Sequence, residues 1–300
     1  MSTARSPGAQ AIAAQAVEGV LTVIPPRVPA VPLVFDSPHS GTTIPADFRP
    51  AVSPDLVLTS ADTHVDALFD FAPDLGAPLL AAHFPRSFLD VNRSLLDMDL
   101  ALVDGAWPDP VRDSPSARRG MGLIWRFAWG DTPMYDRPLS VDEIRARIDR
   151  YWRPYHAALR ELIEAGHRRF GRVYHVNCHS MPERGHKLSP DPEGSERVDI
   201  VLGDREGTSC EPDFVALVET RMRGFGYTVA INRPFKGAEL VAAYSDPARG
   251  RHSLQIEINR RLYMDKATRA RTAGFTTLRA QLAELGAAMR SYAVDAANRA

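Results

Sequence analysis

Cysteine is scarce in this chain of 300 residues, which contains only Cys178 and Cys210. The two do not form a CxxC pair, so the sequence argues against a disulfide framework and against a zinc site built from thiolates. An excess of charge of one sign is also lacking, because 36 Lys and Arg residues stand against 37 Asp and Glu residues, for a net charge of -1. That balance gives no indication of a nucleic-acid or membrane-surface partner.

Several common signatures are missing as well. Every apolar run is shorter than the roughly 20 residues that a membrane-crossing helix needs. The first thirty residues are rich in Ala and lack a basic start followed by an apolar run and a cleavage site, so we expect a cytoplasmic protein. The sequence has no GxSxG elbow, no phosphate-binding glycine motif and no HExxH pair. These absences argue against an α/β-hydrolase serine enzyme, a nucleotide-binding protein and a zincin.

What the sequence does contain is an alternation of short apolar segments with segments of helical periodicity, which predicts strands and helices in turn. We expect strands at 32–35, 78–82, 88–91, 173–178, 199–202, 227–231 and 253–258. We expect helices at 11–23, 65–75, 140–169, 212–224 and 272–300. The helix at 140–169 is expected to begin at a capping box made by Ser140 and Glu143, and to kink or split at Pro154.

The alternation predicts a single α/β domain, with a mostly parallel mixed sheet and helices on both faces. A length of 300 residues also fits one large domain better than two full ones. Residues 1–30 are expected to form an N-terminal extension, and residues 31–300 the domain itself. Residues 97–140 are rich in Gly, Pro and Asp without a sustained period, so we expect a long loop insertion there.

Two of the predicted strands lead into histidines. The strand at 32–35 runs toward His39, and the strand at 173–178 ends at His179. In open α/β sheets the functional crevice lies beyond the carboxyl ends of the strands, so both imidazoles are expected to face it. One such histidine alone is about as often a satisfied loop residue as a ligand. Two histidines at strand ends favour a metal site.

The segment 62–66, with the sequence DTHVD, places three metal-capable side chains just before a predicted helix. A catalytic zinc takes three protein ligands and keeps one position open. We expect His64 to be the third ligand, with Asp62 and Asp66 accepting imidazole N–H groups. Asp62 is the alternative ligand. The ordinary explanation for both aspartates is that acids favour the first turn of a helix.

Glu257 lies between two isoleucines in a predicted strand, where a carboxylate is costly unless it is paired or used in chemistry. Beside a metal, it could act as the general base that takes a proton from the attacking water. The alternative is a structural ion pair with Arg260 or Arg261.

Four cations near strand ends and in the polar loop are candidates for binding an anionic substrate. They are Arg93, Arg126, Arg233 and Lys236. Guanidinium groups bind carboxylates in bidentate fashion, so several cations near one crevice imply an anionic substrate. Because Arg is abundant in this chain, a plain surface role is the alternative for each, and it weighs most for Arg126.

Several of these segments together resemble the N-formylglutamate amidohydrolase family. The similar segments follow one another in the family's order over residues 32–270, and they read SPHSG, DTHVD, DVNR, YWRPYH, CHS, RPFKG and QIE. The resemblance implies a phosphorylase/hydrolase-like α/β fold, related to zinc carboxypeptidases and to zinc amidases of cell-wall turnover. It also implies that His39, His64 and His179 hold one zinc ion per chain and that Glu257 is the catalytic acid–base group.

The activity that this resemblance implies is hydrolysis of the N-formyl amide of N-formyl-L-glutamate, a small anionic N-acyl amino acid, to formate and glutamate. Arg93 or Arg126 would stabilise the oxyanion, and Arg233 and Lys236 would bind the substrate carboxylates. Histidine degradation is the pathway suggested by the resemblance. Two alternatives are a zinc amidase that acts on another N-acyl amino acid or small peptide, and a non-catalytic binding protein that has kept the fold.

Overall fold

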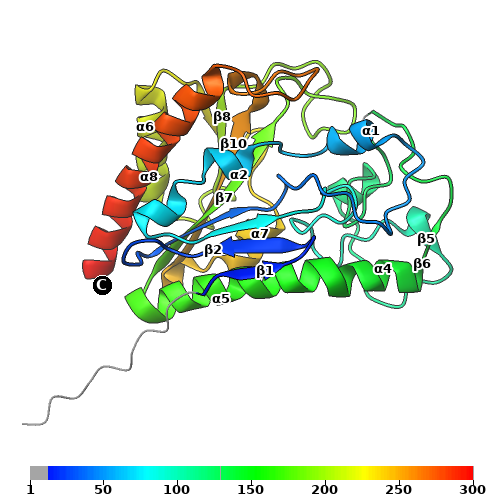
Figure 1. Cartoon of the computed structure of the whole chain (residues 1–300), viewed down its shortest axis with the longest axis horizontal. Helices are drawn as coiled ribbons and strands as arrows, with labels where there is room; N and C mark the ends of the chain where they lie inside the picture. Colours follow the sequence, from blue (N-terminus) through cyan, green and yellow to red (C-terminus); the bar gives the residue numbers. More distant parts are fainter. Residues whose placement is uncertain (1–12, 129, 300) are drawn as a thin grey trace, which may run out of the picture.

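The computed structural model describes residues 13–128 and 130–299, and within them a mixed sheet of eight strands lies between helices (Figure 1). The strand order is β1-β2-β4-β3-β7-β10-β8-β9. The strands of this sheet are β1 (Gln15–Val17), β2 (Leu21–Ile24), β3 (Leu33–Ser37), β4 (Leu79–Ala82), β7 (Val173–Met181), β8 (Ile200–Gly203), β9 (Val229–Ile231) and β10 (Arg251–Asn259). A two-stranded ladder of β5 (Val103–Asp104) and β6 (Leu139–Ser140) lies apart from it.

The helices of the described residues range from single turns to seven turns. The α-helices are α1 (Pro54–Leu58), α2 (Val65–Leu68), α3 (Pro115–Arg118), α4 (Val141–Arg147), α5 (Arg153–Phe170), α6 (Pro212–Gly224), α7 (Glu239–Tyr244) and α8 (Gly274–Asn298). The 3₁₀ turns are η1 (Ala72–Leu75), η2 (Leu100–Leu102), η4 (Pro247–Arg249) and η5 (Arg260–Leu262), and η3 (Ile148–Trp152) is a π-helical turn. The helix predicted at 212–224 is confirmed by α6, which begins with a proline at its first position.

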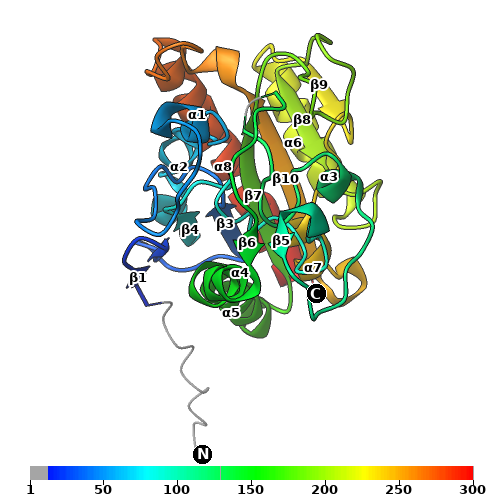
Figure 2. The same cartoon turned by 90° about the vertical axis from the view of Figure 1, so that its right-hand side faces the viewer.

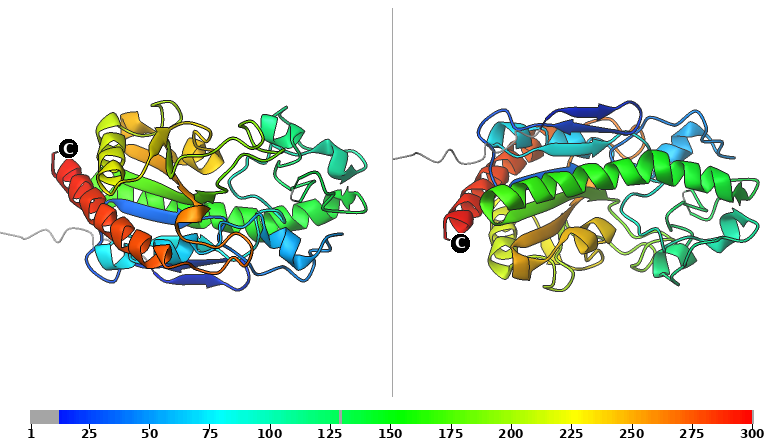
Figure 3. Two further views of the ribbon diagram at one scale, coloured as in Figure 1. Left: turned by 90° about the horizontal axis from the view of Figure 1, so that it is seen from above. Right: turned by 90° about the horizontal axis from the view of Figure 1, so that it is seen from below.

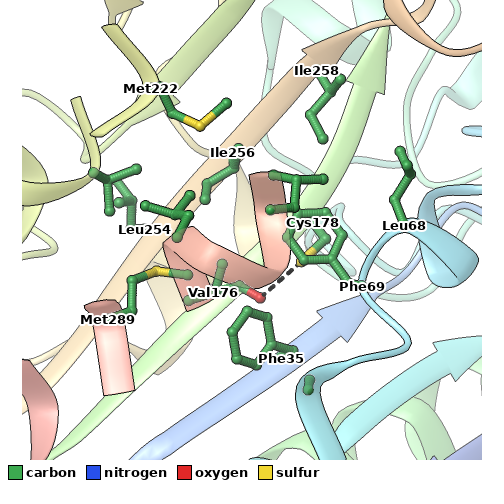
Figure 4. Close-up of a cluster of buried hydrophobic side chains, with 14 of the residues drawn as sticks. Phe35, Leu68, Phe69, Val176, Cys178, Met222, Leu254, Ile256, Ile258 and Met289 are labelled. Carbon is green, nitrogen blue, oxygen red and sulfur yellow. Dashed lines mark hydrogen bonds between the residues drawn. The ribbon is translucent and has the colours of Figure 1, made fainter. Parts of the chain in front are cut away.

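Helices cover both faces of the sheet. Figure 3 shows α8 crossing the strands in the view from above and α5 running along them in the view from below. Beneath α8, apolar side chains from β3, β7 and β10 pack with α2 and α6; Figure 4 shows Phe35, Val176 and Ile256 among them. Cys178 is part of this core, and both cysteines are buried and free. A second apolar cluster lies beneath α5.

The centre of the sheet is parallel, whereas its flanks are mixed. β7 pairs in parallel with β3 on one side and with β10 on the other. β2 joins β4 in antiparallel fashion, and β8 joins β10 in the same way. The expected single α/β domain with a mostly parallel mixed sheet and two helical layers is therefore confirmed. All nine residues of β7 are buried, as is usual for a central strand covered on both faces.

The N-terminal segment differs from the prediction. Residues 13–30 contain β1 and β2, which extend the edge of the sheet beside β4, so this part of the expected extension belongs to the domain. The helix predicted at 11–23 is wrong where the structure describes it, because residues 21 and 23 alternate with more exposed positions as a strand requires. Residues 11 and 12 lie outside the described residues.

The long helix predicted at 140–169 is present in two parts. Ser140 caps α4 by accepting a hydrogen bond from the Glu143 backbone N–H. The π-helical turn η3 separates α4 from α5, and Pro154 lies in the first turn of α5, where its missing N–H is tolerated. Gly171 ends α5 with a φ of 74°, a left-handed conformation that favours glycine.

The described part of residues 97–140 gathers at the end of the molecule that carries α4, far from the C-terminus in Figure 1, and Figure 2 looks onto this end. Apart from η2, α3 and the two short strands, the described part of this segment is irregular, as predicted. The strand predicted at 88–91 is wrong, because these residues form turns that lead into this region. No helix among the described residues combines the length and apolar character needed to cross a membrane.

Candidate metal centre

Three buried side chains meet beyond the carboxyl end of β3. His39 follows β3, His179 lies near the end of the neighbouring β7, and Asp62 lies in the turn between α1 and α2. A backbone hydrogen bond of 2.8 Å from Asp62 N–H to the His39 carbonyl ties two of these segments together. Close chain packing holds the His39 turn in place, because a Cβ added at Gly41 would lie 2.2 Å from the His83 carbonyl carbon.

The three side chains present one ligand atom each toward a common point. The distances are 3.1 Å between the Nδ1 atoms of His39 and His179, 3.1 Å from His179 Nδ1 to Asp62 Oδ2, and 3.6 Å from His39 Nδ1 to Asp62 Oδ2. Ligand atoms around a tetrahedral zinc, at bond lengths of about 2.0–2.2 Å, lie roughly 3.4 Å apart. The triangle of two nitrogens and one oxygen therefore fits such an ion.

The outer nitrogen of each imidazole has an acceptor. His39 Nε2 lies 2.7 Å from Asp90 Oδ1, and His179 Nε2 lies 2.7 Å from Asn177 Oδ1. When Nε2 carries the proton and donates it to such a partner, Nδ1 keeps a lone pair for a metal. The two acceptors at Nε2 therefore suit the histidine tautomers that a bound metal requires. Both Nδ1 atoms face Asp62, and Asn92 Nδ2 also lies 3.2 Å from His179 Nε2.

Asp62 is the charged member of the cluster. Burial alone would raise the pKa of its carboxyl group, but the hydrogen bonds from His179 and His39 and the charge of Arg260 hold that pKa well below its usual range. The guanidinium of Arg260 donates to Asp62 Oδ1 at 2.9 Å, on the side away from the histidines. An ionised carboxylate beside two imidazoles is a ligand set that suits zinc.

His64, the expected third ligand, is not part of this cluster. It occupies the left-handed region with a φ of 70° at the start of α2. Its Nε2 lies 2.9 Å from the Arg269 carbonyl oxygen, and its ring packs edge-on against Phe275. The structure therefore gathers Asp62, the alternative ligand, with His39 and His179.

Glu257 lies beside the cluster on β10. Its partner in the parallel ladder of β7 and β10 is His179, and its Oε1 accepts a 2.8 Å hydrogen bond from the Gln255 amide. Burial raises the pKa of this carboxyl group, partly opposed by the charge of His179. The structural ion pair considered for Glu257 is not formed, because Arg260 binds Asp62 and Arg261 binds Asp199.

A pocket beside the cluster is lined by four arginines, two of which contact the cluster's carboxylates. Arg86 donates to Asp90, the partner of His39, at 2.9 Å, and Arg260 donates to Asp62. Arg197 pairs with Asp191, whereas Arg93 donates from Nε and Nη1 to the backbone carbonyls of Met121 and Asn92. The pocket wall also contains Trp125, over which the Arg86 guanidinium lies at 5.1 Å from the ring centroid.

Arg93 differs from the other three arginines of the pocket wall in its pairing. Its ion-pair contact with Asp90 spans 4.0 Å, whereas Arg86 and Arg260 each have a carboxylate oxygen at 2.9 Å. Arg197 has one at 2.7 Å. Burial lowers the pKa of Arg93, and the charge of Arg86 adds to that effect. A partly buried guanidinium that two carbonyls hold in place, without a close carboxylate, is ready to bind an anion.

The other predicted substrate-binding cations lie elsewhere. Among the described residues, the wall of this pocket includes Arg93 but not Arg126, Arg233 or Lys236. Arg126 pairs with Asp99 at 2.8 Å, and Lys236 pairs with Glu206 at 3.3 Å near the surface. Arg233 is exposed and precedes a cis proline.

Four residues of the centre were not predicted in these roles: Arg86, Asp90, Asn177 and Arg260. Asn177 stands two positions before His179 on the same strand, so both side chains point to the same face of the sheet. That spacing is a sequence signal that could have identified Asn177. Arg86 and Arg260 reach the centre through tertiary contacts, for which the sequence contains no local signal.

Comparison with known proteins agrees with this geometry. Residues 31–264 match the family described as N-formylglutamate amidohydrolase. The chain is 32% identical over 245 residues to a protein of Pseudomonas aeruginosa named N-formylglutamate deformylase, covering 79% of this chain and 83% of that protein. A protein of the same name from Pseudomonas putida is 30% identical over 244 residues, with the same coverage.

Solved structures give the same result. The crystal structure of an N-formylglutamate amidohydrolase from Ralstonia eutropha superposes with a TM-score of 0.88 at 48% identity, covering 92% of this chain and 98% of that one. The gene product Atu2144 of Agrobacterium tumefaciens shares the fold, with a TM-score of 0.65 at 20% identity over 91% of this chain and 95% of that one. The chain belongs to the N-formylglutamate amidohydrolase family.

Proposed function

We propose that this protein hydrolyses the N-formyl amide of N-formyl-L-glutamate to formate and glutamate with the help of one bound zinc ion. The names of its relatives support the substrate. The observation that carries the proposal is the convergence of His39 Nδ1, Asp62 Oδ2 and His179 Nδ1, with Glu257 and a cationic pocket beside them.

His39, Asp62 and His179 would hold the ion, since two nitrogens and one carboxylate oxygen are donors that zinc accepts. When bound, zinc supplies Lewis acidity that polarises the formyl carbonyl and makes water more acidic. The residues around the ligands keep them in place. Asp90 and Asn177 hold the two imidazoles, and Arg260 holds the Asp62 carboxylate.

Glu257 is the residue that moves protons. Its buried carboxylate takes a proton from the attacking water and passes it to the nitrogen of the leaving glutamate. Burial raises its pKa, which makes it a better base than an exposed glutamate. Gln255 donates to one of its oxygens, which leaves the other oxygen for the proton transfers.

Arg93 binds the anionic part of the reaction. The two backbone carbonyls fix its guanidinium in the pocket wall, which leaves its remaining N–H groups for a substrate carboxylate or for the developing oxyanion. Arg126, Arg233 and Lys236 have no such position in the pocket wall. Arg93 is therefore the cation that we assign to the substrate, and histidine degradation is a pathway that such an activity would serve.

The proposal is tested by a matched pair of substitutions within the segment 62–66. Asp62→Ala removes a ligand, so we expect the purified variant to lose stoichiometric zinc and formate release together. His64→Ala is the control, because its imidazole binds the Arg269 carbonyl, and this variant should keep both properties. The reverse pattern, with zinc lost in His64→Ala and kept in Asp62→Ala, would refute the assigned ligand set.

A further inference from the structure

A second layer of buried polar groups lies behind the metal centre, and Asp36 is its hub. Asp36 is in β3, with no exposed surface. Its Oδ1 accepts hydrogen bonds from His175 Nε2 at 2.8 Å and from Asn177 Nδ2 at 2.7 Å, and its Oδ2 accepts one from the Tyr155 hydroxyl at 2.8 Å. Three donors thus converge on one carboxylate that the chemistry proposed above does not use.

These contacts leave the Asn177 side chain a single orientation. An amide presents two N–H donors on one side and an acceptor oxygen on the other. Because Asp36 Oδ1 accepts from the amide nitrogen, the Asn177 oxygen must face His179 Nε2, at 2.7 Å. If the amide were reversed, its N–H groups would face His179 Nε2, and that ring nitrogen would have to accept.

The orientation of the Asn177 amide decides which group His179 Nε2 meets at its shortest contact. The other neighbour of this nitrogen is Asn92 Nδ2 at 3.2 Å, a donor, because the Asn92 oxygen already accepts from the Leu240 N–H. A metal on Nδ1, which lies 3.1 Å from Asp62 Oδ2, requires the ring proton on Nε2, and the Asn177 oxygen is the acceptor for that proton. A reversed Asn177 amide would leave Nε2 between two donors and would favour the proton on Nδ1. A protonated Nδ1 cannot bind a metal.

We propose that Asp36 is a positioning residue for the metal centre, which acts by fixing the Asn177 amide so that its oxygen accepts from Nε2 of His179 when Nδ1 binds the metal. This inference rests on the proposed function for its metal, although its test needs no turnover. The carboxylate is suited to the task because it is ionised. Burial alone would raise the pKa of Asp36, but the charge of His175 and the hydrogen bonds from His175, Asn177 and Tyr155 lower that pKa.

Asn177 needs an acceptor oxygen at position 36, so two substitutions at this position should differ in their effect on zinc affinity. Asp36→Leu removes the acceptor, and we expect a zinc affinity about 10- to 100-fold lower than that of the wild type, as for other residues that orient metal ligands. Asp36→Asn keeps an oxygen for Asn177, while its amide nitrogen can donate to the Tyr155 hydroxyl. We expect this variant to bind zinc within a few-fold of the wild type.

Tyr155→Phe is the matched control, because it removes a donor from the same carboxylate on the side away from Asn177. Its zinc affinity should equal that of the wild type even if its melting temperature falls. Zinc affinity is measured by competition with a chelator, on full-length protein whose folding is checked by circular dichroism. Equal affinity in the wild type and a folded Asp36→Leu would overturn the proposal, as would equal losses in Asp36→Leu and Tyr155→Phe.

The wild-type protein provides a second test that does not depend on how the variants fold. Nitrogen-15 chemical shifts of the His179 ring in the zinc-loaded full chain report which nitrogen carries the proton and which binds the metal. A proton on Nε2 and zinc on Nδ1 are expected, and a ring that binds zinc through Nε2 would contradict the proposal. Failure of zinc binding in the wild type itself would count against the proposed function, whereas equal zinc affinity of the wild type and Asp36→Leu would count against this inference alone.

Discussion

Glu257 is the residue on which the proposed proton transfers depend. It is buried on β10 opposite His179, and burial raises its pKa. A glutamine of the same shape keeps the hydrogen bond from Gln255 but cannot accept a proton from water. A substitution of Glu257 therefore tests proton transfer separately from metal binding, because Glu257 is not one of the three converging side chains.

For Glu257→Gln we expect a kcat lower by about 10²- to 10⁴-fold, the usual contribution of a general base, with zinc content unchanged. Formate release under saturating substrate and metal analysis of the same sample measure both quantities. Glu206→Gln, at an exposed carboxylate that pairs with Lys236, serves as the control and should leave kcat unchanged. A Glu257→Gln variant with nearly full activity would remove this residue from the mechanism.

Arg93 carries the prediction about substrate binding. Arg93→Ala should lower kcat/KM by about 10- to 100-fold, because a charge-assisted hydrogen bond contributes about 1.5–3 kcal/mol. Arg93→Lys should recover only part of the loss, since an ammonium cannot make a bidentate contact. Arg118→Ala, which removes an exposed arginine paired with Asp113, is the control. Unchanged kinetics in Arg93→Ala would mean that another cation binds the substrate.

At the scale of residues, the sequence predicted which segments meet at the centre but did not decide which side chain of the segment 62–66 joins the two histidines. His39, His179 and Glu257 were found from polar side chains at strand ends and from a carboxylate in an apolar strand. The choice between His64 and Asp62 could not be made in this way. It depends on the positive φ of His64 and on the distant Arg269 carbonyl that its imidazole binds.

At the scale of elements, the helix pair α4 and α5 connects the sheet to the irregular region 97–140. Arg147 of α4 is 1% exposed, and its guanidinium donates to Glu143, to the Tyr135 hydroxyl and to the Phe88 carbonyl. It also lies over the Phe88 ring, 4.3 Å from the centroid. This side chain thus connects α4 to the segments that contain Phe88 and Tyr135.

Arg147→Ala should lower the free energy of unfolding by about 3–5 kcal/mol, because it leaves buried partners unsatisfied. Arg145→Ala on the same helix is the matched control. That arginine is half exposed and pairs with Asp109 at 3.4 Å, so its loss should cost at most about 1 kcal/mol. Urea unfolding of the three proteins compares the values. Equal stability of the two variants would show that Arg147 does not anchor this region.

Elements with strong local signals were predictable, and those made by tertiary contacts were not. The helix at 212–224 has a proline start and a clear apolar face, and it was found to the residue. The alanine-rich segment at 11–23 favours a helix by propensity, but the described part pairs with β4, and sheet pairing overrides propensity. Phe88, Leu89 and Val91 are apolar because they are buried in the second apolar cluster, without pairing as a strand.

At the scale of the whole molecule, the sheet explains why distant residues meet. β3 and β7 are parallel neighbours, so the ends that carry His39 and His179 lie at one edge of the sheet, and β10 brings Glu257 beside them. The alternation of elements predicted this parallel centre. The antiparallel addition of β2 and β8 depends on pairings between segments far apart in the chain, which no local pattern encodes.

The central claim, a metal-dependent deformylase, is tested most directly by measuring zinc content and formate release from N-formyl-L-glutamate on one preparation, before and after chelation. We predict about one zinc per chain, loss of formate release when the metal is removed, and its recovery when zinc is added back. Undiminished formate release from protein free of metal would contradict the account.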